Sequence, residues 1–136
     1  MRRYWLEILL IFAIALMLVF CFTAGAETIP TKNAVRAIIG EASNQGYHGM
    51  LAIACGIRNR GTLKGVYGLR AKHVDSQPKW VWTQARKAWL ESEYNRIHDG
   101  YMWENITAFG KPSWYNDVRE VYRYKDHVFF VEKEDN

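Results

Sequence analysis

The feature that most constrains the fold is an uninterrupted apolar run near the N-terminus, which spans residues 8–22. An arginine pair precedes the run, and a small-residue Ala-Gly-Ala stretch that ends at Ala26 follows it. A cationic start, a short apolar stretch and a small-residue site in this order are typical of an export signal that is cleaved off. We therefore expect residues 1–26 to be a signal peptide and residues 27–136 to form one mature domain.

An uncleaved membrane anchor is the alternative for the same segment. The apolar run holds 15 residues, whereas a membrane-spanning helix needs roughly 20. Uncharged sequence continues through residue 26, however, and lengthens the run. We expect an exported protein, either free or anchored by residues 8–26, with no other contact to a membrane.

The composition argues against a disordered chain and against a membrane protein with several spans. The hydrophobic fraction of 49% and the charged fraction of 24% are ordinary for a globular domain. The formal net charge of +4 favours an anionic partner, but the cations are scattered rather than striped, so we expect no nucleic-acid partner. No phosphate-binding glycine loop is present, and the histidines do not lie at metal-ligand intervals, so we expect no metal and no cofactor. These histidines are His48, His73, His98 and His127.

Apolar residues recur at helical spacing in three segments of the remaining chain. The first predicted helix covers residues 31–43, with Thr31 as its N-cap. A second, mostly buried helix follows a short glycine turn and covers residues 50–60. A third helix is capped by Ser76, and its buried face carries Trp82.

The other segments predict an excursion, a binding loop and a hairpin. Residues 61–76 contain three glycines without periodicity and predict a surface excursion that lines a cleft. Residues 99–117 are loop-like and rich in aromatic residues, so we expect this segment to bind the ligand. Two β-rich runs, residues 121–124 and 127–131, predict a hairpin. The chain is thus expected to be α+β: a mainly helical domain with a small C-terminal β-hairpin.

The most informative stretch ends the first predicted helix, in the sequence Ala-Ile-Ile-Gly-Glu41-Ala-Ser. A carboxyl group at the end of an apolar helix, beside a glycine-rich turn, can be partly desolvated while it still faces a cleft. Desolvation raises its pKa, and a protonated carboxyl group can donate to a leaving glycosidic oxygen. Spacing alone nevertheless favours an ordinary exposed carboxylate near a helix end over this catalytic role.

The residues around Glu41 resemble the signature of the SleB-type cell wall hydrolases, the family that includes spore cortex-lytic enzymes. In that family the glutamate of Gly-Glu-Ala is the catalytic acid, and Gly40-Glu41-Ala42 matches the motif directly. The similarity covers most of residues 34–131, but residues 61–80 lack the Gln-Phe-Ser-Trp pattern common in the spore enzymes. The further matching segments are Trp103-Glu104-Asn105, Phe109-Gly-Lys-Pro112, Trp114 and His127-Val-Phe-Phe.

The resemblance implies a lysozyme-like fold in a monomeric enzyme of the periplasm or cell wall, with peptidoglycan glycan strands as its partner. It implies cleavage of the bond between N-acetylmuramic acid and N-acetylglucosamine, with Glu41 as general acid and base. Lytic transglycosylase chemistry, in which the substrate supplies the nucleophile, is favoured over muramidase-type hydrolysis at the same site. A non-catalytic peptidoglycan-binding module is a further alternative. A two-carboxylate mechanism would need a second acid, for which the candidates are Asp75, Asp99, Glu104 and Asp117.

Aromatic side chains are the candidates for sugar binding, because their flat faces pack against sugar C–H groups. Glu104 and Asn105 are expected to orient the N-acetyl groups of the substrate. Asn59 and Arg60 are expected to brace the catalytic helix rather than to contact substrate. The aromatic candidates for glycan subsites are Tyr47, Trp103, Trp114 and Tyr115.

Overall fold

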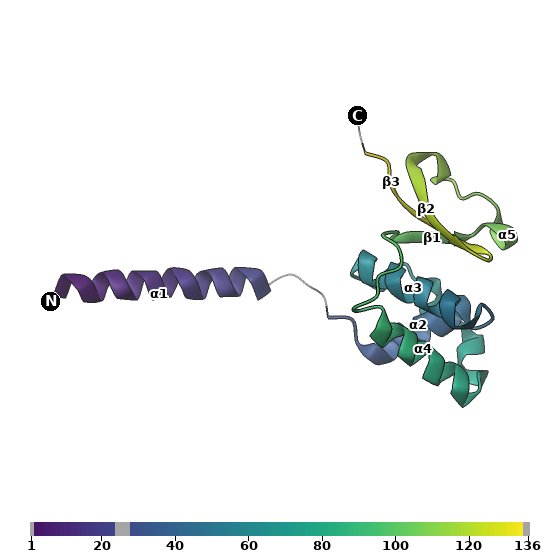
Figure 1. Cartoon of the computed structure of the whole chain (residues 1–136), viewed down its shortest axis with the longest axis horizontal. Coiled ribbons are helices and arrows are strands. Elements are labelled where there is room, and N and C mark those ends of the chain that lie inside the picture. The colour runs from purple at the N-terminus through teal and green to yellow at the C-terminus, as the bar shows by residue number, and fades with distance from the viewer. Residues whose placement is uncertain (1, 24–27, 135–136) are drawn as a thin grey trace.

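The computed structural model describes residues 2–23 and 28–134 (Figure 1). The folded part has a helical layer and a three-stranded antiparallel sheet, which confirms the predicted α+β, mainly helical fold. The elements are, in order, α1 (Arg2–Thr23), α2 (Thr31–Ala42), α3 (Gly46–Arg60), the 3-10 helices η1 (Tyr67–Arg70) and η2 (Lys72–Ser76), α4 (Lys79–Glu91), β1 (Met102–Asn105), α5 (Ile106–Phe109), the 3-10 helix η3 (Tyr115–Asp117), β2 (Val118–Tyr124) and β3 (His127–Glu132).

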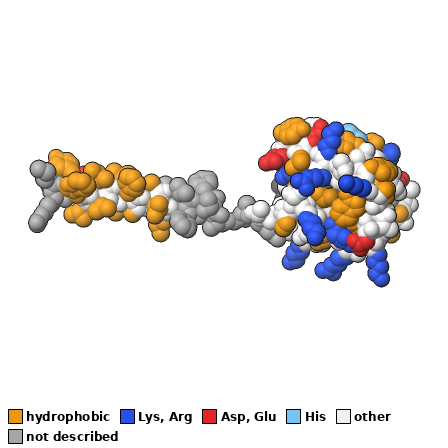
Figure 2. Space-filling view, turned by 90° about the horizontal axis from the view of Figure 1, so that it is seen from below, with side chains coloured by type: hydrophobic (Ala, Val, Ile, Leu, Met, Phe, Trp, Pro, Cys, Tyr) orange, Lys and Arg blue, Asp and Glu red, His pale blue; other side chains and the backbone are white. Residues whose placement is uncertain are grey.

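The N-terminal apolar run forms the helix α1. Its side chains at residues 4–17 are exposed, and most of them are hydrophobic (Figure 2). Within the part of the chain that the structure describes, no helix is both long and apolar enough to cross a membrane. The predicted cleavage site after Ala26 lies outside the described residues, so the signal peptide stays a prediction.

Local sequence determines where the other helices begin and end. Two of the predicted N-caps, however, are not the residues that precede their helices in the structure. α3 ends at Arg60 and is capped by Gly61, whose φ of 75° lies in the left-handed region that glycine adopts without strain. Pro30, not Thr31, precedes the first turn of α2, and its carbonyl accepts two N–H groups of that turn. Similarly, Ser76 lies in η2, and Pro78 is the residue that precedes α4. Proline suits these positions because it has no N–H to leave unpaired and its φ matches the helix entry.

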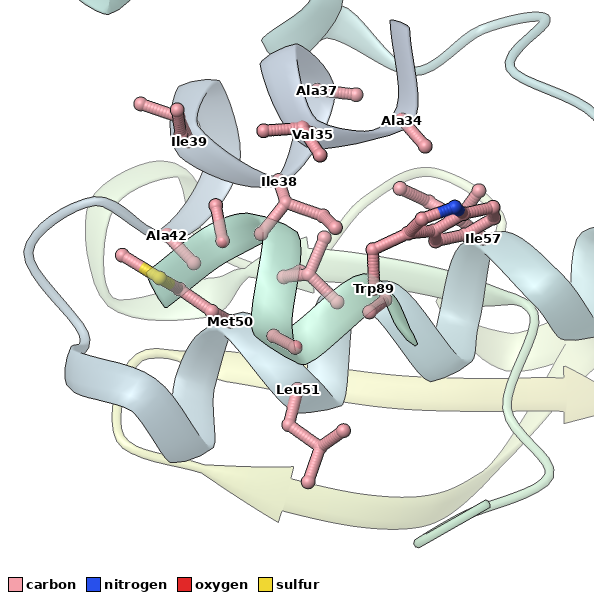
Figure 3. Close-up of a cluster of buried hydrophobic side chains, with 14 of the residues drawn as sticks. Ala34, Val35, Ala37, Ile38, Ile39, Ala42, Met50, Leu51, Ile57 and Trp89 are labelled. Carbon is pink, nitrogen blue, oxygen red and sulfur yellow. The ribbon is translucent and has the colours of Figure 1, made fainter. Parts of the chain in front are cut away.

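The main core lies between α2, α3 and α4 (Figure 3). α3 is the central helix: residues 49–57 are buried on every side, as expected for a helix that is apolar all round. Ile38 of α2 and Met50 of α3 are fully buried, and Trp89 contributes from α4. Trp82, predicted for the same face of α4, is only partly buried and packs at the edge of this core.

The sheet has the order β1-β3-β2, so β3 is its central strand. The predicted hairpin is present as β2 and β3, whereas β1 lies in a segment that was predicted to be a loop. β3 is buried on both faces, which accounts for its continuous apolar sequence. Phe129 belongs to the helical core, and Phe130 packs with Val128 and Val118 in a smaller cluster.

The predicted surface excursion folds back onto α2 through η1 and η2. Val66 and Val74 bury their side chains in the main core. The guanidinium of Arg36 on α2 donates to the carbonyl of Leu69 at 3.1 Å and forms an ion pair with Asp75 at 2.7 Å. These contacts hold the backbone of η1 against the end of α2, where Glu41 lies.

Candidate active site

An open groove of about 1070 Å³ runs between the end of α2, the excursion and the sheet. Its wall combines aromatic rings with a small number of charged and polar side chains, as ligand-binding clefts commonly do. The excursion contributes to this wall, as predicted for a segment that lines a cleft. The lining residues are Gly40, Glu41, Ser43, Asn44, Arg60, Gly65, Tyr67, His73, Met102, Trp103, Glu104, Asn105, Phe109, Trp114 and His127.

Glu41 lies partly buried in the wall of the groove. Its Oε1 accepts a hydrogen bond from the backbone N–H of Gly68 at 2.8 Å, and its Oε2 accepts a longer one from the indole N–H of Trp103 at 3.4 Å. Burial raises the pKa of Glu41, and the negative charge of Glu104 raises it further, whereas the two hydrogen bonds and the charge of Arg60 lower it. Burial is the largest of these effects, so the carboxyl group keeps its proton to a higher pH than an exposed glutamate does.

Two glycines make this arrangement possible. A Cβ atom on Gly40 would lie 2.0 Å from the carbonyl oxygen of Gly68, and a Cβ atom on Gly68 would lie 2.5 Å from the carbonyl oxygen of Ala37. Only glycine at both positions lets the backbone of η1 touch the backbone of α2. This close approach aims the Gly68 N–H at Glu41, which gives a structural reason for the glycine that precedes the glutamate.

Trp103 is held in place from two sides. A Cβ atom on Gly56 of α3 would come within 3.0 Å of the indole ring, so the ring packs directly on the backbone of that helix. The guanidinium carbon of Arg60 lies 5.6 Å from the centre of the ring, within cation–π range. The strand β1 thus presents a fixed aromatic side chain beside the carboxyl group of Glu41.

Three other predicted residues also line the groove. Glu104, Asn105 and Trp114 line the groove with Trp103, so the structure brings them together with Glu41. The Oδ1 of Asn105 accepts the N–H of Ala108 at 2.9 Å and caps α5. This bond leaves the amide NH₂ of Asn105 as its donor toward a ligand.

Tyr47, a predicted sugar subsite, does not line the groove. It lies in the first turn of α3, where its hydroxyl donates to the carboxylate of Glu91 on α4. Tyr115 is not a lining residue either, because its ring packs edge-on against Phe130 at 5.8 Å. Of the four candidate second acids, only Glu104 lines the groove. Asp75 is engaged with Arg36 instead.

Several residues of the groove were not predicted individually from the sequence. Arg60 was expected to brace the catalytic helix, but it lines the groove and lies against Trp103. Asn59 instead braces the segment before β1, because its amide donates to the carbonyls of His98 and Gly100, both at 2.9 Å. Gly65, Tyr67 and His73 belong to the excursion that was expected to line a cleft. The other lining residues that were not candidates are Gly40, Ser43, Asn44, Met102, Phe109 and His127. The glycine-rich sequence of the excursion was the signal that could have indicated that Gly65 and Tyr67 line the groove.

The raised pKa of Glu41 predicts a pH-dependent effect of Glu41→Gln on stability. A proton held more tightly in the folded state than in the unfolded chain contributes stability below the unfolded pKa, and this contribution is lost as the pH rises through the folded pKa. Glutamine does not titrate, and its amide oxygen can still accept the Gly68 N–H. We expect the melting temperature of the variant, relative to wild type, to increase from about pH 4 to about pH 8. A difference that stays constant over this range in a thermal melting series would contradict the raised pKa.

Comparison of the chain with models of known protein families, with curated proteins and with solved structures finds no match. The interpretation of the site therefore depends on its geometry and on the motifs of the sequence.

Proposed function

We propose that this protein cleaves the glycan strands of peptidoglycan, with Glu41 as the proton donor. The observation that carries the proposal is a partly buried carboxyl group with a raised pKa in the wall of an open groove lined with aromatic side chains. An acid that stays protonated above the ordinary carboxyl range can protonate a leaving oxygen, as general acid catalysis requires. Trp103 and Trp114 supply flat faces for sugar rings. The resemblance of Gly40-Glu41-Ala42 to the SleB-type motif points to the same chemistry.

The proposed reaction is that of a lytic transglycosylase. Glu41 donates its proton to the oxygen between N-acetylmuramic acid and N-acetylglucosamine, and the bond from that oxygen to the muramic C1 breaks. The 6-hydroxyl of the same muramic residue attacks C1, and its proton passes to the Glu41 carboxylate. The products are an anhydromuramic end and a free 4-hydroxyl on N-acetylglucosamine, and no water is consumed.

The two oxygens of Glu41 have different roles in this proposal. Oε1 is held by the short bond from the Gly68 N–H, whereas the bond from Trp103 to Oε2 is at the limit of hydrogen-bond length. Oε2 is therefore the oxygen that releases the proton to the substrate and later accepts one. Gly68 and Trp103 then stabilise the carboxylate that forms when the proton leaves.

Muramidase-type hydrolysis is the alternative for the same groove. Glu104 lies in the groove wall, and its charge acts on Glu41, so it is the candidate second carboxylate. In that mechanism Glu104 would activate a water molecule or attack C1 directly. The sugar end that is formed distinguishes the two reactions.

The proposed function is tested by incubating the protein with purified sacculi and analysing the soluble fragments by mass spectrometry. We expect muropeptides with anhydromuramic ends, each lighter by one water molecule than the corresponding reducing end. Fragments with reducing muramic ends would show that the reaction is hydrolysis and not transglycosylation. Binding to sacculi without release of any fragment would contradict the proposed function and would favour a non-catalytic binding module.

A further inference from the structure

A second hollow of about 510 Å³ adjoins the groove on the side of the excursion. It lies between the start of α2 and the segment that follows α3, and Gly65 and Tyr67 line both the hollow and the groove. Tyr67 is 86% exposed and so forms a ridge shared by the two depressions. The other lining residues of the hollow are Ile29, Pro30, Asn33, Thr62, Leu63, Lys64, Val66, Leu69 and Arg70.

We propose that this hollow binds the peptide stem of the N-acetylmuramic acid residue that occupies the groove. The inference depends on the proposed function, because it assumes that the groove holds a glycan strand. The stem is attached to the lactyl group on C3 of muramic acid, the same sugar whose C1 bond is cleaved. A stem that leaves the groove across Tyr67 enters the hollow directly.

The charges of the hollow complement those of a stem peptide. Lys64 and Arg70 line it, and none of the lining residues that the structure describes is acidic. Asp75, the acidic residue of the same excursion, is paired with Arg36 at 2.7 Å and is not a lining residue. A stem peptide carries free carboxylates on its glutamate and on its terminal residue, so cations without competing carboxylates suit it.

The apolar part of the hollow fits the rest of the stem. Leu63, Val66 and Leu69 of the excursion line the hollow, together with Ile29 and Pro30, which directly precede α2. Stem peptides are rich in alanine, whose methyl groups match small apolar surfaces of this kind. The arrangement of cations beside apolar walls therefore discriminates a stem peptide from a bare sugar chain.

The test compares the affinities of two soluble peptidoglycan fragments for the full-length protein by calorimetry. One is the disaccharide of N-acetylglucosamine and N-acetylmuramic acid, and the other is the same disaccharide with its tetrapeptide stem. Neither contains the bond that the protein is proposed to cleave, so the result does not depend on catalysis. Two exposed ion pairs predict about tenfold tighter binding of the fragment with the stem.

The double substitution of Lys64→Gln with Arg70→Gln is expected to reduce this preference to less than about twofold. Its affinity for the bare disaccharide should remain that of wild type, because neither side chain lines the groove. The control is Lys79→Gln with Arg86→Gln, which removes the same charge from exposed positions of α4 and should keep the preference.

Equal affinity of the wild-type protein for the two fragments would overturn the stem site. So would a preference that the control variant loses as much as the Lys64 and Arg70 variant does, since net charge would then explain it. Failure of the protein to release fragments from sacculi would instead count against the proposed function, and the calorimetric comparison would still decide whether the hollow recognises a stem.

Discussion

Replacing Gly40 with alanine is expected to destabilise the fold by about 3 kcal/mol, although alanine is the better helix former. Gly40 lies inside α2, where propensity alone predicts that alanine stabilises by about 1 kcal/mol. The added Cβ would lie 2.0 Å from the carbonyl oxygen of Gly68, and backbone atoms cannot rotate away as a side chain does. The backbone of η1 must then separate from α2, which breaks the bond from the Gly68 N–H to Glu41. Denaturant unfolding measures the change in free energy.

Gly46→Ala is the matched control for this substitution. Gly46 has a φ of 75°, and no atom lies within 4 Å of the position that its Cβ would occupy. We expect the free energy of unfolding of Gly46→Ala to fall by about 1 kcal/mol from backbone strain alone. This variant should retain full activity on sacculi. Gly40→Ala should lose more stability and most of its activity. A Gly40→Ala variant as stable as wild type would contradict the contact between η1 and α2.

The three core helices of this protein could be predicted from its sequence because their patterns are local, whereas the short α5 lies in a segment that was predicted to be loop-like. Apolar spacing indicated α2, α3 and α4, and two short runs rich in β-branched and aromatic residues indicated the hairpin of β2 and β3. The caps were less predictable, because Thr31 and Ser76 are good caps in isolation but Pro30 and Pro78 lie in the positions that precede each helix. β1 was missed because its four residues become a strand only through pairing with β3.

The site shows the same division between local and non-local information. Glu41 was identified from a short motif, and Trp103 and Glu104 from a similar one, and all three line the groove. Gly68 carries no chemical group that a sequence pattern would single out, yet its N–H donates to Glu41. Tyr47 was misplaced because its type suits sugar binding, whereas its place in the first turn of α3 directs it toward Glu91.

Replacing Glu41 with glutamine is expected to lower the rate of fragment release from sacculi by at least about 1000-fold. The amide has nearly the same shape as the protonated carboxyl group and can accept the Gly68 N–H, but it cannot donate a proton to the leaving oxygen. The variant should bind sacculi as the wild-type protein does. Its melting temperature near neutral pH should be at least that of wild type, because the penalty for burying a carboxylate is removed.

Glu93→Gln is the matched control, since it makes the same change at an exposed carboxylate outside the groove. The most direct measurement is the initial rate at which wild type, Glu41→Gln and Glu93→Gln release soluble muropeptides from purified sacculi. The three proteins are compared at the same amount of protein bound to the sacculi. We predict that wild type and Glu93→Gln release fragments at the same rate and that Glu41→Gln releases almost none. Release by Glu41→Gln at the wild-type rate would contradict the assignment of Glu41 as the proton donor.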